Sequence, residues 1–351
     1  MSSHYEQLVE RLGFGGSKRL LALLEYLLSP DQAAICAALP ASVEEVAEKT
    51  GLDVETVRTN LDELFVKGVV FPRGSFVERS YYRFARDIIQ LHDATQASQK
   101  LDQVKDRRLF QLWEDFCAHE MYPFLAGLSK NLPRAMARVV PAYQAVKDFP
   151  DLQPWENFHE ILKAQEKIAV VPCSCRSRSS AVGEGCAYTD EPSKWKCLQF
   201  GRGADYVIAR GSGKPLTLEE ALELSDQIEE VGLVHIGGYD RSMFFNTSCQ
   251  CCHDCCELFV SMNRHDGDLE KLYAKSRYAA YVSTDDCSGC QNCLERCHFD
   301  AIDLVRTGKK YKAAVNEEKC WGCGLCVLTC EPGAIRLKAV RPPEYIPEAA
   351  G

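Results

Sequence analysis

The cysteines of this chain crowd into its second half. Of 19 cysteines in 351 residues, 17 lie between residues 173 and 330, and only Cys36 and Cys117 precede them. In a reducing compartment thiols are not held in disulfides, so clustered cysteines are typical of metal ligands. We therefore expect the chemistry of the protein in residues 173–330, with Cys36 as a small buried core residue.

Eight of these cysteines form a motif that occurs twice. Each copy has four cysteines separated by two, two and three residues, and the second copy follows at an offset of 33 residues. The copies are Cys287, Cys290, Cys293 and Cys297, and Cys320, Cys323, Cys326 and Cys330. Gly289 and Gly322 match at the same offset. The duplicated unit over residues 281–340 resembles the bacterial ferredoxin domain that holds two 4Fe–4S clusters.

The resemblance implies which thiolates bind each cluster. In this family the fourth ligand of each cluster comes from the other copy of the motif. One cluster would take Cys287, Cys290, Cys293 and Cys330, and the other Cys320, Cys323, Cys326 and Cys297. His298 and Glu331 follow the last cysteine of each copy, where the family usually has proline, so the sequence does not predict the cluster potentials. Zinc also accepts four thiolates, but zinc ribbons use paired cysteines instead of runs of four.

Nine further cysteines lie in the middle of the chain, and we expect them to bind metal as well. They are Cys173, Cys175, Cys186, Cys197, Cys249, Cys251, Cys252, Cys255 and Cys256. Eight of them would hold two further iron–sulfur clusters of the 4Fe–4S type and leave one thiol spare; a non-cubane cluster is the alternative. Adjacent cysteines rarely bind the same cubane, so we expect each adjacent pair to divide between clusters. The stretch resembles a module of bacterial and archaeal iron–sulfur proteins that also carry a two-cluster ferredoxin tail.

Four other residues of the middle region are candidates for a role. His235 and His253 are candidate ligands or proton donors, although a histidine that follows an apolar strand, as His235 does, is more often a buried structural residue. Arg176 and Arg178 could offset the charge of a cluster or bind an anionic substrate. Residues 211–215 do not form a phosphate-binding loop, and no flavin or nicotinamide site is visible, so electrons are expected from another protein.

The first 90 residues predict helices followed by a two-stranded ribbon, which resembles a winged-helix domain. Ser42 and Glu45 form a capping box, Gly51 ends that helix, and Asp53 caps the third helix, which Gly68 ends. Residues 1–90 hold 10 Lys/Arg and 13 Asp/Glu, and a recognition helix for DNA would be basic. We therefore expect a packing or homodimerisation module and no DNA binding.

These patterns predict an α+β protein of several domains. The winged-helix-like domain (1–90) is followed by a helical connector (91–165), a cysteine-rich α/β iron–sulfur domain (166–280), the two-cluster ferredoxin domain (281–340) and a tail (341–351). Charged residues interrupt every apolar stretch, and the first residues lack the basic start and apolar core of a signal peptide, so we expect a cytoplasmic chain without a membrane span.

Three functions compete at this point. The first is a multi-cluster electron-transfer protein that exchanges single electrons with a ferredoxin-type partner and with an oxidoreductase complex. The second is an iron–sulfur reductase with a substrate-binding cluster in the middle domain. The third is an iron–sulfur transcriptional sensor, which the acidic third helix opposes. A cluster with fewer than four protein ligands beside a polar cavity would favour the reductase.

Overall fold

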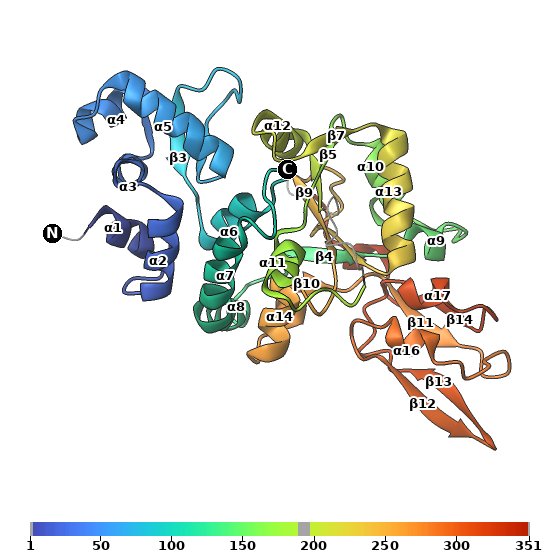
Figure 1. Cartoon of the computed structure of the whole chain (residues 1–351). Coiled ribbons are helices and arrows are strands. Elements are labelled where there is room, and N and C mark those ends of the chain that lie inside the picture. Colours follow the sequence, from blue (N-terminus) through green and yellow to red (C-terminus); the bar gives the residue numbers. More distant parts are fainter. Residues whose placement is uncertain (1–2, 189–196, 350–351) are drawn as a thin grey trace.

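The computed structural model describes residues 3–188 and 197–349. The chain runs from a group of helices at one end, through a mixed sheet, to a cysteine-rich unit whose hairpin projects at the other end (Figure 1). The carboxyl-terminal segment returns to the sheet, where the carbonyl of Ile346 accepts a hydrogen bond of 2.9 Å from Nε of Arg241. Among the described residues no single helix is both long and apolar enough to cross a membrane. Of the described helices, only the bent pair α2 (Lys18–Leu27) and α3 (Pro30–Ala38) meets those limits when its two helices are counted together.

The amino-terminal part has five helices and a three-stranded sheet of order β1-β3-β2. The predicted caps are present: Ser42 and Glu45 form a reciprocal box, and Gly51 and Gly68 adopt the left-handed conformation. The elements are α1 (His4–Arg11), α2 (Lys18–Leu27), α3 (Pro30–Ala38), β1 (Ala41–Ser42), α4 (Val43–Thr50), α5 (Val54–Lys67), β2 (Val70–Pro72) and β3 (Tyr81–Phe84). Their order agrees with a winged helix, which remains a prediction.

This part is not a separate globule, because its core continues into the rest of the chain. Phe14 packs edge-on against Phe116 with ring centroids 5.0 Å apart, and one buried apolar cluster extends from Leu8 to Leu325. The helices that continue this core beyond the amino-terminal part are α6 (Ile88–Gln96), α7 (Arg107–Phe116), the π-helical turn η1 (Cys117–Met121) and α8 (Tyr122–Ser129).

A seven-stranded sheet of order β10-β4-β8-β9-β6-β5-β7 forms the centre of the molecule. Its strands are β4 (Ala137–Val140), β5 (Ile168–Val171), β6 (Cys197–Phe200), β7 (Lys214–Leu216), β8 (Val234–Gly238), β9 (Thr247–Cys251) and β10 (Tyr273–Ala274). All pairs are antiparallel except β10 with β4. Residues 91–165 are therefore not purely helical, because β4 pairs with β8 inside the sheet.

Helices surround this sheet and place its loops. They are α9 (Tyr143–Val146), η2 (Pro154–Glu156), α10 (Phe158–Lys163), α11 (Ser174–Val182), α12 (Gly201–Ala209), α13 (Leu218–Val231), α14 (Glu257–Arg264) and α15 (Leu269–Leu272). A capping box of Thr217 and Glu220 opens α13, and Gly232 ends it in the left-handed conformation. The interior strands β6 and β9 and the starts of α11 and α14 carry most of the middle cysteines.

The carboxyl-terminal unit repeats one small motif. It has two antiparallel ladders, β11 with β14 and β12 with β13, and two short helices. The elements are β11 (Tyr278–Val282), α16 (Asn292–Glu295), β12 (Ile302–Thr307), β13 (Lys310–Val315), α17 (Leu325–Leu328), β14 (Ile335–Ala339) and η3 (Pro343–Tyr345). The 33-residue offset extends to the backbone: Gln291 (φ 74°) corresponds to Gly324 (φ 79°), and Asp300 (φ 48°) to Gly333 (φ 64°).

Candidate metal centres

Four cysteines of the carboxyl-terminal unit line one pocket, and we call them the outer group. They are Cys287, Cys290, Cys293 and Cys330. Cys290 is exposed, so this group reaches the surface. Backbone amides of Ala313 and Ile335 donate to the sulfurs of Cys287 (3.5 Å) and Cys330 (3.3 Å).

The other four cysteines line a second pocket, and we call them the inner group. They are Cys297, Cys320, Cys323 and Cys326. The amide of Ala280 donates to the sulfur of Cys320 (3.3 Å) and that of Ala301 to Cys297 (3.4 Å). Each pocket thus combines three cysteines of one motif copy with the last cysteine of the other, which is the set that the resemblance implies. Amide hydrogen bonds to ligand sulfurs help to set the reduction potential of an iron–sulfur cluster.

Two glycines bring the backbone close around these groups. Gly289 has φ of 79°, and a Cβ on it would lie 2.3 Å from the carbonyl oxygen of Tyr311. Gly322 has φ of 66°, and its Cβ would lie 2.1 Å from the carbonyl oxygen of Tyr278. A side chain at either position would therefore meet backbone atoms that have no room to yield.

The buried thiols of this unit favour the neutral form when no metal is bound. Burial raises the pKa of Cys293 to about 11 and that of Cys323 to about 12. Metal coordination needs the thiolate, so each of these ligands releases a proton when it binds. Loading of both pockets therefore depends on pH.

Six of the middle cysteines form a closed ring, which we call the six-thiol group. Following the contacts around the ring, its members are Cys173, Cys175, Cys256, Cys251, Cys249 and Cys197, and the side chain of each interacts with those of its two neighbours. They come from the start of α11, from β6 and β9, and from the residue before α14. Six thiols exceed the four corners of a single cubane.

Contacts between neighbouring thiols shift the pKa values within the six-thiol group in opposite directions. Contacts with neighbouring thiols lower the pKa of Cys173, Cys249 and Cys256, that of Cys249 to about 6. The same contacts raise the pKa of Cys175, Cys197 and Cys251. Six thiolates at this spacing would repel one another strongly, so a cationic metal centre is needed to deprotonate the whole ring.

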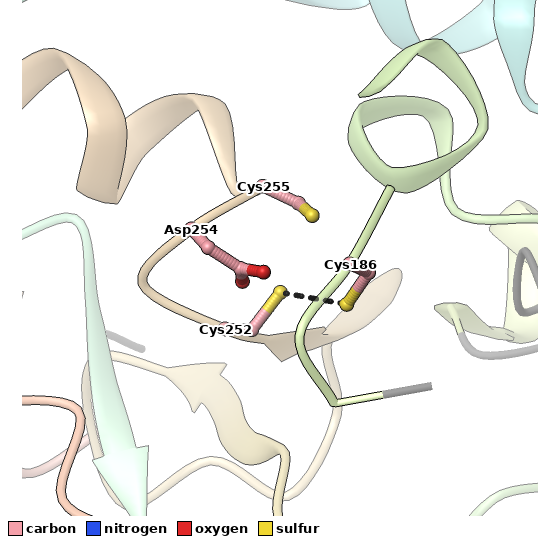
Figure 2. Close-up of side chains that lie close together, drawn as sticks. All are labelled: Cys186, Cys252, Asp254 and Cys255. Atoms are coloured by element: carbon pink, nitrogen blue, oxygen red, sulfur yellow. Dashed lines mark hydrogen bonds between the residues drawn. The ribbon is translucent and has the colours of Figure 1, made fainter. Parts of the chain in front are cut away.

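The remaining three middle cysteines gather around Asp254, and we call them the three-thiol group. Figure 2 shows Cys186, Cys252 and Cys255 turned toward one another beside the Asp254 carboxylate, and the four ligand atoms all lie within 4.8 Å of one another. The sulfurs of Cys186 and Cys252 are 3.8 Å apart. Oδ2 of Asp254 accepts a hydrogen bond of 2.7 Å from the amide of Ala187, whereas Oδ1 is buried and has no partner among the described residues.

The donor set of the three-thiol group suits a metal. A tetrahedral ion about 2.3 Å from each sulfur separates two sulfurs by about 3.8 Å, which is the spacing of Cys186 and Cys252. The three thiols and the carboxylate could also serve as the four ligands of an iron–sulfur cluster, if the sulfurs moved apart to surround a group larger than a single ion. In both cases the unpartnered Oδ1 of Asp254 would be available as the fourth protein ligand.

A buried arginine connects the two middle groups. Arg176 follows Cys175 in α11 and is 1% exposed. Its Nε donates to the sulfur of Cys186 (3.3 Å), and its Nη2 donates to the sulfur of Cys252 (3.2 Å) and to the carbonyl of Gln250 (3.1 Å). Nη1 is buried without a partner among the residues that the structure covers. Arg176 therefore places a positive charge where anionic metal centres would form.

Two histidines connect the three-thiol group with the inner group. Nδ1 of His298 accepts a hydrogen bond of 3.3 Å from the amide of His253 and lies 3.2 Å from Nδ1 of that histidine. His253 is the neighbour of Cys252 in the chain, and His298 is the neighbour of Cys297. Nε2 of His298 contacts the carbonyl of Gly232 at 2.7 Å. The histidine that replaces proline in the first motif copy is therefore the contact between the two regions.

Other predicted residues have structural positions. His235 stacks on Phe158 with ring centroids 4.0 Å apart, and its Nε2 lies 3.1 Å from Oε1 of Glu229, so it is a buried structural residue. Arg178 is 1% exposed and bonds to Glu114 (2.8 Å), to His92 and to Tyr122, so it has no face free for a substrate. The two members of each adjacent pair, Cys251-Cys252 and Cys255-Cys256, lie in different groups.

Sequence reasoning missed three residues near these groups. Asp254 lies inside the cysteine-rich octad (residues 249–256), but a lone aspartate among cysteines does not by itself predict a ligand. In the sequence, His298 differs from the family pattern, but nothing there shows that it contacts His253. Asp93 accepts a hydrogen bond of 2.7 Å from Ser174, which lies between Cys173 and Cys175; nothing in the sequence connects it to them across 80 residues.

Comparison with known proteins gives one finding that agrees with this geometry. The family model described as "4Fe-4S dicluster domain" matches residues 280–337, the part of the chain that holds the outer and inner groups. The carboxyl-terminal region is thus a 4Fe–4S domain within a mixed α+β chain, and the protein is an iron–sulfur protein with further cysteine groups outside that domain. No curated protein matches the chain.

Proposed function

We propose that this protein is a multi-cluster electron carrier that passes single electrons between a ferredoxin-type partner and a redox enzyme complex. The observation that carries this proposal is the order of the four cysteine groups. Contacts in the fold connect them one after another, from the exposed outer group through the inner group and the three-thiol group to the buried six-thiol group. Two 4Fe–4S clusters would occupy the outer and inner groups, and further metal centres would occupy the other two.

Specific contacts support each step of this order. Each motif copy contributes its last cysteine to the pocket of the other copy, so the two clusters would lie in the same small unit. The inner group reaches the three-thiol group through His298 and His253. The three-thiol group receives hydrogen bonds from Arg176, the chain neighbour of Cys175 in the six-thiol group, and each of the pairs Cys251-Cys252 and Cys255-Cys256 places one member in each group.

The surface beside the outer group suits an acidic redox partner. The hairpin β12–β13 projects away from the rest of the molecule (Figure 1) and carries exposed Arg306, Lys309 and Lys310. Lys312 of the same hairpin donates to the carbonyl of Cys287. Complementary charge increases the association rate of redox partners, and this basic hairpin would guide such a partner to Cys290.

The amino-terminal part is proposed to serve assembly, including a homodimer, and not to bind DNA. Basic side chains around α5 are already paired with acids: Arg58 lies 3.8 Å from Glu44, and Arg79 lies 2.7 Å from Asp62. Such pairs leave little positive charge along α5 for a phosphate backbone.

An anaerobic count of iron and sulfide with EPR tests the proposal. Two cubanes alone give about eight irons, and two further cubanes raise the count to about sixteen. About eight irons with bound zinc would mean that the middle groups hold zinc and do not carry electrons. Absence of 4Fe–4S signals from anaerobically purified protein would refute the whole proposal, and Cys36→Ala serves as a control because Cys36 lies in the apolar core.

A second function, an iron–sulfur reductase, is favoured by the three-thiol group. An iron held by the Asp254 carboxylate would exchange its ligand more readily than one held by a fourth thiolate. Added cyanide should then change the EPR spectrum of the native protein but not that of Asp254→Cys. Identical responses of the two proteins would leave only the electron carrier.

A further inference from the structure

A cavity of about 490 Å³ lies between the amino-terminal strands and the strands that carry the six-thiol group. One wall comes from β2, β3 and the turn between them, and the other from α6, α12 and the ends of β5, β6 and β9. Its size is within the usual range of small-molecule sites, roughly 300–1,000 Å³. No part of the electron path described above uses it.

The cavity is strongly basic. It is lined by five arginines, Arg73, Arg83, Arg86, Arg202 and Arg210, but by a single carboxylate, Asp93. Arg86 pairs with Asp87 at 2.7 Å outside the lining. Burial lowers the pKa of Arg83, and the nearby charge of Arg86 adds to this effect.

Three of these arginines bond only to neutral groups. Arg83 donates to Gln90 (2.7 Å), Arg202 to the carbonyl of Gly74 (2.9 Å), and Arg210 to the carbonyl of Ala94 (2.7 Å). Within the described part of the chain none of the three forms an ion pair, and Nε of Arg210 is buried without a partner. Positive charge held in place by neutral groups is available to an anion.

Aromatic rings form an apolar side of the same cavity. Phe71 and Tyr206 stack with centroids 4.9 Å apart and an interplanar angle of 21°, and Phe76 lies 5.7 Å from Tyr206. Arg83 lies over Phe71 (4.7 Å) and Arg202 over Phe76 (4.5 Å). Flat rings beside guanidinium groups suit a ligand that has both a planar apolar part and a negative charge.

The cavity adjoins the six-thiol group. Its lining residue Asp93 accepts the hydrogen bond from Ser174, between Cys173 and Cys175. Val171, Gln199 and Thr247 also line it, and each lies two residues from a cysteine of the ring. A molecule bound here would therefore lie close to the metal centre of that group.

We propose that this cavity binds a small organic anion with a flat apolar ring, and that Arg83 and Arg202 bind its carboxylate or phosphate. This extends beyond electron transfer, because it assigns a ligand site that the carrier function does not need.

Calorimetry on the anaerobically purified full-length protein tests this with four probes: benzoate, phenyl phosphate, inorganic phosphate and the neutral benzamide. We expect benzoate or phenyl phosphate to bind at least ten times more tightly than benzamide. Arg83→Gln and Arg202→Gln should each weaken that binding at least tenfold. Arg108 is exposed at the start of α7, outside the cavity lining, so Arg108→Gln removes one positive charge elsewhere. This control should change the affinity less than twofold.

The outcomes separate the ligand site from the electron path. Failure of both organic anions to bind, in protein with its full iron content, would overturn the site and leave the carrier function intact. Equal binding of phenyl phosphate and inorganic phosphate would refute the role of the aromatic rings. The comparison of benzoate with benzamide needs no substitution, so the site can be tested even if an arginine variant misfolds.

Discussion

Replacement of Arg176 by methionine is the most direct test of the coupling between the two middle groups. The guanidinium is buried and donates to the sulfurs of Cys186 and Cys252 at 3.3 and 3.2 Å. Methionine keeps a long apolar side chain but removes both hydrogen bonds and the charge. A positive charge near a cluster stabilises its reduced, more negative state, so its loss should lower the reduction potential.

The size of this effect follows from the contact distance. A unit charge 3.2 Å from a sulfur contributes about 5 kcal/mol at an effective dielectric constant of about 20. The added electron is spread over a whole cluster, so about half of this energy, roughly 2–3 kcal/mol, should act on the couple. For one electron, about 59 mV corresponds to a tenfold change in the equilibrium constant, so we expect the potential to fall by about 100 mV.

A redox titration followed by EPR measures this shift. The signals of the outer and inner groups should keep their potentials, whereas a signal from the middle groups should move down by about 100 mV. Arg264→Met, at the end of α14 opposite Cys256, removes an exposed positive charge and should shift the potential by less than about 20 mV because water screens it. An unchanged or raised potential in correctly folded Arg176→Met would refute the assigned role of the arginine.

Three other predictions follow from the site and the fold. Cys297→Ala should convert the inner cluster to a three-iron form with an EPR signal in the oxidised state, and Cys330→Ala should do the same to the outer cluster. Damage to the outer cluster in Cys297→Ala, or to the inner cluster in Cys330→Ala, would contradict the exchange of ligands. Gly322→Ala should destabilise the protein by more than about 2 kcal/mol in urea unfolding, because the new Cβ meets the Tyr278 carbonyl. Gly308 also has a positive φ (63°) but faces open space, so Gly308→Ala should cost only about 1 kcal/mol. Similar losses in the two variants would refute the steric cause. Burial lowers the pKa of His159 in the folded state, even though Oδ1 of Asp226 lies 3.1 Å from its Nε2. The unfolded chain therefore binds more protons, and the free energy of unfolding should fall as the pH drops below about 6.5. His159→Asn should reduce this pH dependence, and an unchanged slope between pH 7.5 and 5.5 in the variant would contradict the prediction.

Much of the local structure could be predicted from the sequence. The capping boxes of Ser42 and Thr217 and the helix ends at Gly51, Gly68 and Gly232 are present because each depends on residues three or four positions apart. The duplicated cysteine motif also predicted the 4Fe–4S domain, since the spacing within each copy reflects the shape of the cluster. Such signals are short-range, so the chain carries them without reference to the rest of the fold.

Only the tertiary structure divided the middle cysteines into groups of six and three. The sequence suggested two sets of four with one spare, because counting thiols gives no information on which strands lie side by side. Cys197 joins Cys249 because β6 pairs with β9, and Asp254 faces Cys186 because the loop after α11 meets the octad. The strand β4, which the sequence placed in a helical connector, lies in the sheet for the same reason: pairing partners almost 100 residues apart leave no local trace.

The sequence by itself thus determined that this protein is an iron–sulfur protein with a carboxyl-terminal 4Fe–4S domain. The tertiary structure decided which sulfurs meet, that His298 contacts His253, and that five arginines surround a cavity beside the six-thiol group. The physical reason is the range of the interactions: cluster ligands within one motif copy are neighbours along the chain, whereas the other contacts arise only when distant segments pack together.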